Sequence, residues 1–333
     1  MAAGRLDDIA PCTACYYCWN ERINGRYIRC RQNASLGREQ EYAIRPAAKK
    51  KRVMVVGGGP AGMEAARVAA LRGHEVTIYE KEPRFGGSLL PAAMVKGFEI
   101  DDMTLVSRYL ENQIRKLSVG INLGVEVTAS VVTSYKPDVV ILATGGTPAV
   151  PKIPGFNNRH VMQSADLQRR LKALLRFFSP RTLRWLTKFW MPVGKNVVVI
   201  GSGVHGCQLA EFLIKRNRNV TIVDTAEAAG DGLLPPDTKQ RLLNWLTEKG
   251  VVMMNSVRYE AVNNEGLTLF NKEGERKTLR ADTILPALPL MPDNTMYQAL
   301  AKSVAEVYQI GDCREPHLTA EAVADGSRIA HQI

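Results

Sequence analysis

Two glycine-rich loops with the same spacing, about 145 residues apart, constrain the fold of this chain more than any other feature. The first contains Gly57, Gly59 and Gly62, and the second contains Gly201, Gly203 and Gly206. Each loop follows an apolar run typical of a strand and precedes a run typical of a helix. Strand, tight turn and helix begin a βαβ unit, so the repeat predicts two nucleotide-binding domains with parallel sheets.

The elements expected around the two loops come in the same order. Strands are predicted at 52–56, 75–80, 196–200 and 219–224, and helices at 60–72 and 207–215. Further strand-like runs lie at 121–127, 138–143, 281–287 and 304–310. The predicted fold class is therefore α/β, with two Rossmann-like domains.

The first loop has residues suited to a dinucleotide. Gly57 allows the tight turn, Gly59 lets a pyrophosphate approach the backbone, and Gly62 lets the helix pack closely on the strand. The helix N-terminus then faces the anion. Glu80 lies 18 residues past Gly62, where it can accept a hydrogen bond from a ribose. A turn that serves packing alone is the alternative interpretation.

Features further along the chain favour FAD at this first loop. Gly86-Gly87 follows the acid, where a backbone close to the flavin needs small residues. Asp312 follows a predicted strand and could bind the ribityl chain or the pyrophosphate region. The predicted FAD contacts are Gly57, Gly59, Pro60, Ala61, Gly62, Glu80, Gly87, Ser88, Val127, Ala143, Thr144, Gly145 and Asp312.

The second loop is predicted to bind NADH rather than NADPH. Asp224 lies 18 residues past Gly206, and an acid there accepts from a 2′-hydroxyl and repels a 2′-phosphate. Residues 225–231 contain no Lys or Arg that would favour a 2′-phosphate. The predicted contacts are Gly201, Ser202, Gly203, Val204, His205, Gly206 and Asp224, with a solvent-facing His205 as the alternative for that residue.

A group of four cysteines predicts a metal centre near the N-terminus. Cys12, Cys15, Cys18 and Cys30 have the pattern C-x2-C-x2-C-x11-C. Three closely spaced thiolates with a later fourth favour a [4Fe–4S] cluster, because structural zinc usually uses two separated cysteine pairs or Cys and His pairs. Zinc and unligated thiols remain the alternatives. Tyr16, Tyr17 and Trp19 interleave with the cysteines and would shield a cluster from water.

Composition narrows the class of protein further. The net charge is +11, but no nucleic-acid recognition motif accompanies the basic residues, so no nucleic-acid partner is expected. The chain has no uncharged apolar run of 18 residues and no secretory signal at its start, which predicts a cytoplasmic protein. Cys207 and Cys313 form no dithiol motif, and no nucleophile–base arrangement stands out, so no catalytic residue is assigned.

The motifs together resemble a known family. The stretches that carry the resemblance are GRLDDIAPCTAC, GREQEYAIRPAAKKKRVMVVGGGPAGMEAARVAALRGHEVTIYEKEPRFGG, KPDVVILATGG, VGKNVVVIGSGVHG and YQIGDC. They are similar to the C-terminal half of the iron–sulfur flavoproteins related to 2,4-dienoyl-CoA reductase, 2-enoate reductase and trimethylamine dehydrogenase. In that family the N-terminal half is a TIM barrel of the old yellow enzyme type that holds FMN. This chain has no such barrel.

The resemblance implies a domain layout that is glutathione reductase-like. It implies a cluster lobe at 1–45, an FAD-binding domain at 46–152 and 296–333, and an NAD(P)H-binding domain at 153–295. It also implies an electron route from NADH through FAD and the [4Fe–4S] cluster to FMN on a barrel subunit or domain. That barrel would reduce an activated C=C bond of the enoyl-CoA or enoate type, and an oligomer is expected.

Two departures from the family pattern leave alternatives open. The cysteine spacing is nearer to trimethylamine dehydrogenase, where the first nucleotide site holds ADP, and Ser88 stands where relatives often have Gln. A basic segment at about 167–192 also looks inserted, with two apolar helical stripes among Arg and Lys residues. Residues 168–191 are interpreted as an ordinary packed hairpin, a docking site for a partner, or a membrane-surface element.

Overall fold

The computed structural model describes residues 4–95 and 100–333. Residues 1–3 of the predicted cluster lobe and 96–99 of the predicted FAD-binding domain lie outside this range. The chain forms two compact units. The first contains the N-terminal residues up to Ala93, Asp101–Thr147 and Leu290–Ile333, and the second contains Pro148–Pro289 with the described residues of 94–100.

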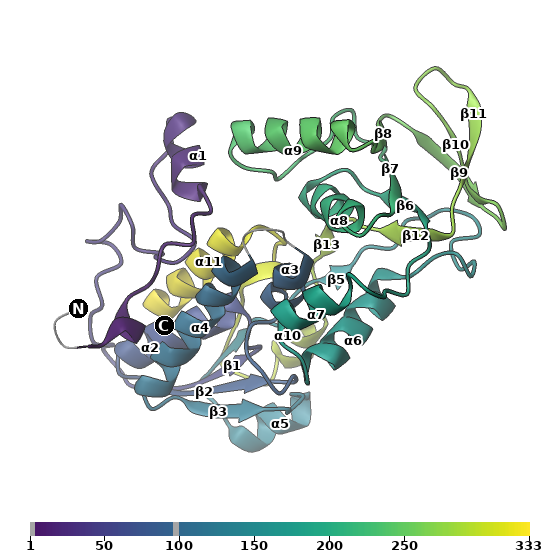
Figure 1. The fold of residues 1–333 in the computed structure, drawn as a ribbon. Coiled ribbons are helices and arrows are strands. Elements are labelled where there is room, and N and C mark those ends of the chain that lie inside the picture. Colours follow the sequence, from purple (N-terminus) through teal and green to yellow (C-terminus); the bar gives the residue numbers. More distant parts are fainter. Residues whose placement is uncertain (1–3, 96–99) are drawn as a thin grey trace. The chain divides into compact units, whose positions relative to one another are not determined.

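The first unit is built on a five-stranded parallel sheet (Figure 1). The strand order is β14-β4-β1-β2-β3, and each neighbouring pair is parallel. The strands are β1 (Arg52–Val56), β2 (Glu75–Glu80), β3 (Gly120–Leu123), β4 (Val139–Leu142) and β14 (Glu306–Gln309). Four residues of β1 and all four of β4 are buried, as expected of central strands in a sheet covered on both faces.

Two helices from opposite ends of the first unit pack against one another. Helix α2 (Pro60–Leu71) follows β1, and α11 (Thr319–Gln332) ends the chain. Gly326 allows their close approach, because a Cβ at this position would lie 2.2 Å from the carbonyl oxygen of Ala61. The other helical elements with residues in this unit are η1 (Leu6–Asp8), α1 (Tyr17–Ile23), α3 (Leu89–Val95), α4 (Ile100–Lys116), α5 (Ala129–Tyr135), α10 (Thr295–Leu300) and η2 (Gly311–Cys313).

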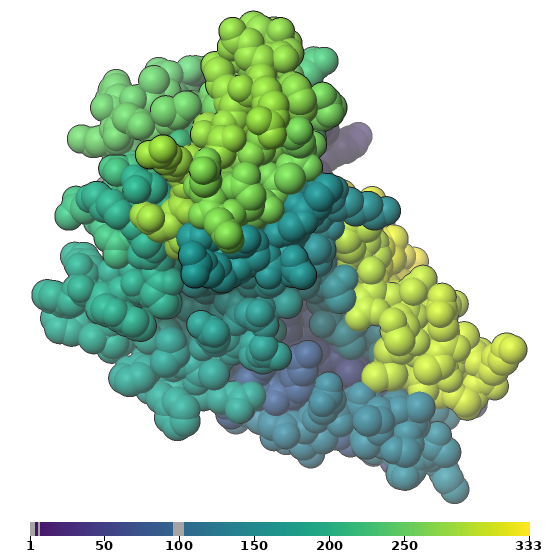
Figure 2. Space-filling view, turned by 90° about the vertical axis from the view of Figure 1, so that its right-hand side faces the viewer, coloured from purple at the N-terminus to yellow at the C-terminus, as the bar shows by residue number. Residues whose placement is uncertain are grey.

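The second unit has a four-stranded parallel sheet and a separate three-stranded antiparallel sheet. The parallel sheet has the order β12-β6-β7-β8, with β6 (Asn196–Ile200), β7 (Asn219–Val223), β8 (Val252–Met254) and β12 (Thr283–Pro286). The antiparallel sheet consists of β9 (Arg258–Val262), β10 (Gly266–Phe270) and β11 (Arg276–Arg280), which are yellow-green in Figure 2. The helices are α6 (Ser164–Leu175), α7 (Pro180–Leu186), α8 (Val204–Ile214) and α9 (Pro236–Glu248).

The last two strands, β5 (Thr147–Pro148) and β13 (Leu290–Met291), form a short two-stranded sheet.

Buried apolar side chains form a separate core in each unit. One cluster includes Met54, Val56 and Leu142, and another includes Ile200, Leu267 and Ile284. No helix in the described part of the chain is both long and apolar enough to span a bilayer.

Several predicted element boundaries were wrong by a few residues. Helix α8 begins at Val204 rather than at 207, so the last residues of the second glycine loop already form its first turn. The strand predicted at 121–127 ends at Leu123, because Gly124 turns the chain with a φ of +72°. Helix α1 within the cysteine motif and the antiparallel sheet were not predicted.

The internal repeat is more regular than the motif spacing alone indicated. Backbone hydrogen bonds recur at a constant offset of 144 residues, which is the separation of Gly57 and Gly201. Gly57 N–H donates to Tyr79 O at 2.8 Å, and Gly201 N–H donates to Val223 O at 2.8 Å. At the other edge of each loop, Ala143 N–H donates to Val56 O and Ala287 N–H to Ile200 O, both at 2.8 Å. The two units therefore share one βαβ construction.

Candidate functional site

The first glycine loop connects β1 to α2 and is shaped by steric necessity. Gly57 has a φ of +113°, and a Cβ there would lie 2.2 Å from the carbonyl oxygen of Ala143. A Cβ at Gly62 would lie 2.0 Å from the carbonyl oxygen of Gly57. Around a Cβ at Gly59, in contrast, there is nothing within 4 Å. Two glycines therefore serve the fold, while Gly59 leaves open space.

That open space adjoins the N-terminus of α2. Gly59 is the N-cap of the helix and supplies no side-chain cap, and Pro60 is its first residue. The N–H groups of a first helical turn have no partner within the helix, and the helix dipole favours negative charge there. An uncapped helix start beside an open glycine fits a phosphate group, which is the fit expected of a dinucleotide.

Glu80 stabilises the first loop from the end of β2. Its carboxylate is buried and accepts the Gly58 N–H at 2.6 Å and the Glu82 N–H at 2.8 Å, through different oxygens. A carboxylate oxygen has a second lone pair, so the group retains capacity for a ribose hydroxyl. A Cβ at position 58 would lie 2.5 Å from Phe85, which explains why this position between Gly57 and Gly59 is also a glycine.

Segments distant in the sequence complete the surroundings of the first loop. The Gly86 N–H donates to Gly58 O at 2.9 Å, and a Cβ at Gly87 would lie 3.1 Å from Gly59 Cα. From the C-terminal part of the chain, Gly311 would place a Cβ 3.0 Å from that of Ala61. The structure thus brings the predicted Gly87 and the residue preceding Asp312 to the glycine loop.

The remaining residues predicted for FAD have different surroundings. Val127 buries its side chain in the apolar core with Met54 and Leu142, which leaves its backbone for any ligand contact. Thr144 and Ser88 are exposed, and Asp312 is half-buried in η2, where it accepts the His317 N–H at 3.4 Å. Gly145, with a φ of +80°, turns the chain after β4.

Sequence reasoning missed a buried carboxylate in this unit. Asp325 on α11 accepts the Gly311 N–H at 2.9 Å and also binds Arg314 and Arg328. It thereby holds the turn that carries Asp312. The signal was present in the Asp-Gly pair in the middle of a helix, because a glycine there usually has a packing reason.

The second glycine loop connects β6 to α8 with the same geometry. A Cβ at Gly206 would lie 1.8 Å from the carbonyl oxygen of Gly201. Asp224 occupies the position of Glu80: its carboxylate accepts the N–H and the Oγ–H of Ser202, and the Ala226 N–H at 3.0 Å. Ser202 is fully buried, whereas His205 is exposed in the first turn of α8.

The second loop differs from the first at the helix N-terminus. The Val204 N–H donates to the carbonyl oxygen of Asp231 at 2.6 Å, and the Gly230 N–H donates to Ser202 O at 2.7 Å. The Asp231 oxygen also lies 3.5 Å from where a Cβ of Gly203 would be. The segment after β7 therefore lies closely against the start of α8.

Of the four clustered cysteines, Cys12 and Cys15 precede α1, Cys18 lies in it and Cys30 follows it. Cys12 and Cys18 are exposed, and Cys15 and Cys30 are half-buried. Backbone N–H groups approach two of the sulfurs: Ala14 N lies 3.4 Å from Cys12 Sγ, and Gln32 N lies 3.3 Å from Cys30 Sγ. In the described residues, no three His, Cys, Asp or Glu side chains are grouped closely enough to hold a metal ion, so the cluster stays a prediction.

The backbone between the cysteines has an unusual conformation. Ala14 and Tyr16 have φ values of +49° and +56°, which non-glycine residues adopt infrequently. Alternation into the left-handed region turns successive N–H groups toward one side and forms concavities that bind anions and iron–sulfur groups. A thiolate-ligated cluster therefore fits the donor set and the local backbone.

Tyr17 joins the cysteine segment to the rest of the first unit. Its side chain is buried, and its hydroxyl donates to Glu321 in the first turn of α11. Burial, with the nearby Glu321 carboxylate, raises the pKa of Tyr17 above its usual value, so the hydroxyl stays protonated. Tyr16 and Trp19, by contrast, are about half exposed, at 57% and 48%, and shielding of a cluster by these three aromatic residues stays a prediction.

The two remaining cysteines are buried and lack reactive character. Burial raises the pKa of the Cys207 thiol to about 11, and it also raises the pKa of Cys313. Both thiols donate to backbone carbonyl oxygens, Cys207 to Ser202 O and Cys313 to Leu142 O, each at 3.2 Å. Both cysteines therefore serve as packing residues, Cys207 in the helix that follows the second glycine loop and Cys313 in η2.

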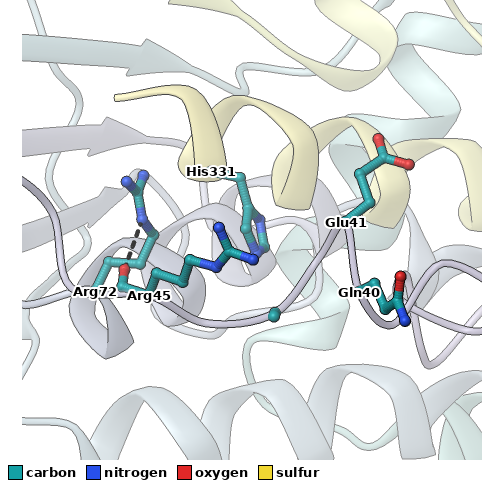
Figure 3. Close-up of a pocket in the computed structure, with 6 residues that line it drawn as sticks. Gln40, Glu41, Arg45, Arg72 and His331 are labelled. Carbon is teal, nitrogen blue, oxygen red and sulfur yellow. Dashed lines mark hydrogen bonds between the residues drawn. The ribbon is translucent and has the colours of Figure 1, made fainter.

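A polar pocket of about 320 Å³ lies in the first unit, away from the glycine loops (Figure 3). Gln40, Glu41, Arg45, Arg72 and His331 line it with Ala43. Arg72 donates to Arg45 O at 3.2 Å and to the carbonyl oxygens of Ala330 and Ile333 at 2.7 Å. These bonds give the backbone carbonyl groups at the C-terminal end of α11 a hydrogen-bond donor. We therefore interpret the pocket residues as structural.

Comparison with known proteins establishes the family. The family described as pyridine nucleotide-disulphide oxidoreductase matches residues 51–326. This chain therefore belongs to that family, with the two-unit α/β fold predicted from its glycine loops.

Individual relatives confirm the family resemblance that the sequence motifs indicated. Cinnamate reductase of Clostridium sporogenes is 29% identical over 332 residues, covering 99% of this chain and 46% of that protein. NADH oxidase of Thermoanaerobacter brockii is 32% identical, covering 99% and 48%. The solved complex of 2-naphthoyl-CoA reductase with 2-naphthoyl-CoA is 33% identical with a TM-score of 0.86, covering 100% and 48%. This chain spans about half the length of these relatives.

Proposed function

We propose that this chain is the NADH-oxidising part of an iron–sulfur flavoprotein reductase. FAD would occupy the first glycine loop, NADH the second, and a [4Fe–4S] cluster would be held by Cys12, Cys15, Cys18 and Cys30. The observation that carries this proposal is the repetition of one nucleotide cradle at a 144-residue offset, each with a buried or half-buried acid on its loop. We propose that the FAD-binding domain is 46–152 with 296–333, and the NADH-binding domain is 153–295.

The residues of the first cradle would bind and orient FAD. The start of α2 faces the pyrophosphate, Glu80 offers a lone pair to the ribose, and Gly87 leaves room beside Gly59. Asp325 fixes the turn of Gly311, so that Asp312 is held near the start of α2. FAD and the [4Fe–4S] cluster, when both are bound, would convert the two-electron transfer of a hydride into single-electron steps.

Three features support a cluster on the cysteine segment. The donor set is all thiolate, the backbone contains two left-handed residues between the first three cysteines, and N–H groups already point at two sulfurs. N–H to sulfur hydrogen bonds stabilise the charge of a thiolate and tune the potential of a cluster. The Tyr17 hydrogen bond to Glu321 keeps this segment on the unit that would hold FAD.

Exposed apolar residues near the cysteines support the proposal that this segment binds a partner protein or domain. Tyr16, Trp19, Ile23, Tyr27 and Ile28 are all exposed on the segment between Cys15 and Cys30. Large apolar side chains grouped on a surface indicate an interaction site. Because the relatives are about twice as long as this chain, we propose that the partner is an FMN-bearing barrel, as a subunit or a domain. Its substrate would be an activated C=C bond of the enoate or enoyl-CoA type.

The test is anaerobic purification followed by cofactor analysis and titration with NADH. We expect one FAD by mass, with iron and acid-labile sulfide in a cluster ratio, and bleaching of the flavin absorbance on addition of NADH. A Cys12→Ser/Cys18→Ser variant should lose iron but keep FAD. Recovery of ADP in place of flavin would favour the trimethylamine dehydrogenase-like alternative, and a colourless protein without iron or flavin would exclude the proposed function.

A further inference from the structure

The helical hairpin of α6 and α7 has an exposed apolar surface of its own. Of the 20 large hydrophobic side chains that are exposed in the described residues, seven lie between residues 174 and 190. We call these seven the hairpin surface: Leu174, Phe177, Phe178, Trp185, Leu186, Phe189 and Trp190. This concentration in one short segment exceeds the scattered apolar exposure that is normal for a protein surface. Both helices, teal in Figure 2, lie at the surface of the second unit.

The hairpin surface belongs to a well-packed element. Leu175 and Leu183 are buried on the inner side of the two helices. Ser179 caps α7 by accepting the Thr182 N–H at 3.1 Å, and Pro180 begins that helix. The inward positions are therefore already filled, and the hairpin surface contains the side chains that the fold leaves outside.

Arg216 fixes the hairpin to the body of the second unit. Its buried guanidinium stacks on the Phe212 ring at 3.5 Å and donates to Arg184 O and to Thr187 Oγ1, both at 2.8 Å. One carbonyl in the last turn of α7, that of Arg184, is thus bound by a cation, which suits the negative end of the helix. The end of α7 consequently has a defined position, just before Phe189 and Trp190.

The most exposed aromatic side chains of the hairpin surface lie at the ends of the two helices. Phe177 follows α6 and is 80% exposed, and Phe189 and Trp190 follow α7 and are each 73% exposed. Trp185 and Phe189 contact each other edge to face, with ring centroids 4.9 Å apart. Exposed Trp, Phe and Leu side chains next to Arg and Lys on a helical element are typical of helices that lie at a membrane surface.

Basic residues alternate with these aromatic residues along the hairpin sequence, and the first of them, Arg169, is ion-paired with Asp166. No Asp or Glu occurs between Asp166 and Glu211 in the sequence. Within this acid-free stretch the exposed cations on the hairpin are Arg169, Arg170, Arg176, Arg181 and Lys188. An apolar surface interleaved with Arg and Lys is complementary to a surface with an apolar interior and a layer of negative charge.

We propose that the α6–α7 hairpin attaches this protein to anionic lipid bilayers. Phe177, Phe189 and Trp190 insert at the headgroup level, where aromatic rings are favoured, and the cations bind lipid phosphates. The hairpin lies on the bilayer and does not cross it. This inference rests on the second unit alone and is independent of which cofactors the cysteines and the glycine loops bind.

The test is flotation of the purified full chain, with whatever cofactors it retains, on phosphatidylglycerol-rich vesicles and on pure phosphatidylcholine vesicles. We expect binding to the anionic vesicles that falls steeply with added salt, and weak binding to the neutral ones. A Phe189→Ser/Trp190→Ser variant should reduce the bound fraction about tenfold or more. The matched control Tyr27→Ser removes an aromatic side chain that is 84% exposed elsewhere and should bind like the parent.

A charge variant separates the two contributions. Arg181→Glu/Lys188→Glu should abolish the preference for anionic vesicles, whereas the control Lys272→Glu/Lys302→Glu, which makes the same change in net charge, should keep it. Unchanged thermal unfolding of all variants shows that the hairpin still folds. The proposal is overturned if the parent does not float, or if it floats equally on both vesicles. It is also overturned if the Phe189→Ser/Trp190→Ser variant instead dissociates an oligomer in gel filtration without changing flotation.

Discussion

The two glycine loops have the same hydrogen-bond framework but differ at the N-terminus of the helix that follows. In the first, Gly59 faces open space and Pro60 begins α2. In the second, the carbonyl oxygen of Asp231 accepts the Val204 N–H and lies beside Gly203. A carbonyl oxygen carries partial negative charge, so it opposes an anion at that helix start. The difference suits a tightly held prosthetic group at the first loop and an exchanging co-substrate at the second.

The largest effect should come from the glycine that packs helix on strand. In Gly62→Ala the added Cβ collides with the Gly57 carbonyl, so we expect a loss of about 2–3 kcal/mol in unfolding free energy and loss of bound flavin. The matched variant Gly59→Ala adds a Cβ to open space, so its urea unfolding should resemble that of the parent. It should nevertheless bind flavin more weakly than the parent does. Equal destabilisation by both changes would contradict the division between packing glycine and ligand glycine.

The acids should show the next largest difference. Both oxygens of each carboxylate accept a backbone N–H, so Glu80→Gln and Asp224→Asn each replace one accepting oxygen with an NH2 group that cannot accept, at a cost of about 1–3 kcal/mol. The cost should be greater at Glu80, which is buried, than at Asp224, which is half-buried. Urea denaturation measures both, and a larger loss for Asp224→Asn would reverse the ranking.

The second loop should discriminate between the two pyridine nucleotides. In the proposed NADH site Asp224 would repel a 2′-phosphate, so we expect kcat/KM for NADH to exceed that for NADPH by about tenfold or more. Asp224→Ala should narrow the ratio mainly by weakening NADH, because residues 225–231 offer no cation to bind a phosphate. Steady-state rates with an artificial dye acceptor give the ratio, and a parent preference for NADPH would refute the assignment.

The smallest effect concerns the thiol below the second loop. Cys207 occupies the position of Met63, 144 residues earlier, and burial raises its pKa from 9.0 to about 11. A raised pKa means that the folded state holds the proton more tightly than the unfolded state does. The contribution of the protonated Cys207 thiol to the free energy of unfolding is therefore complete below pH 9 and is lost as the pH rises toward 11. Unfolding free energy measured from pH 8 to 10.5 should decline by about 1–2 kcal/mol more in the parent than in Cys207→Ala.

Local sequence patterns predicted much of the candidate site. Gly57, Gly62, Gly201 and Gly206 act within one turn of their own strand, so the spacing of the motif reveals their role. The acids were found because each ends the strand that pairs with the strand before its loop. Helix α1 was missed because its short sequence has no apolar period and its N-cap is a left-handed Tyr16.

Residues that act at long range could not be found in this way. Asp325 reaches Gly311 from a helix, and Glu321 meets Tyr17 across 304 positions of sequence. The sequence also left open whether the apolar side chains of residues 168–191 are packed or exposed, and the structure shows Phe189 and Trp190 exposed.

By itself, the sequence determined the two βαβ units, their glycine turns and the acids that hold them, because these depend on contacts between neighbouring strands and the turn that joins them. The tertiary structure alone decided which side chains are left outside, which loop lies against the second helix N-terminus, and how the cysteine segment is tied to α11. The physical reason is that burial and long-range hydrogen bonds depend on where whole elements pack, and a local pattern does not contain that information.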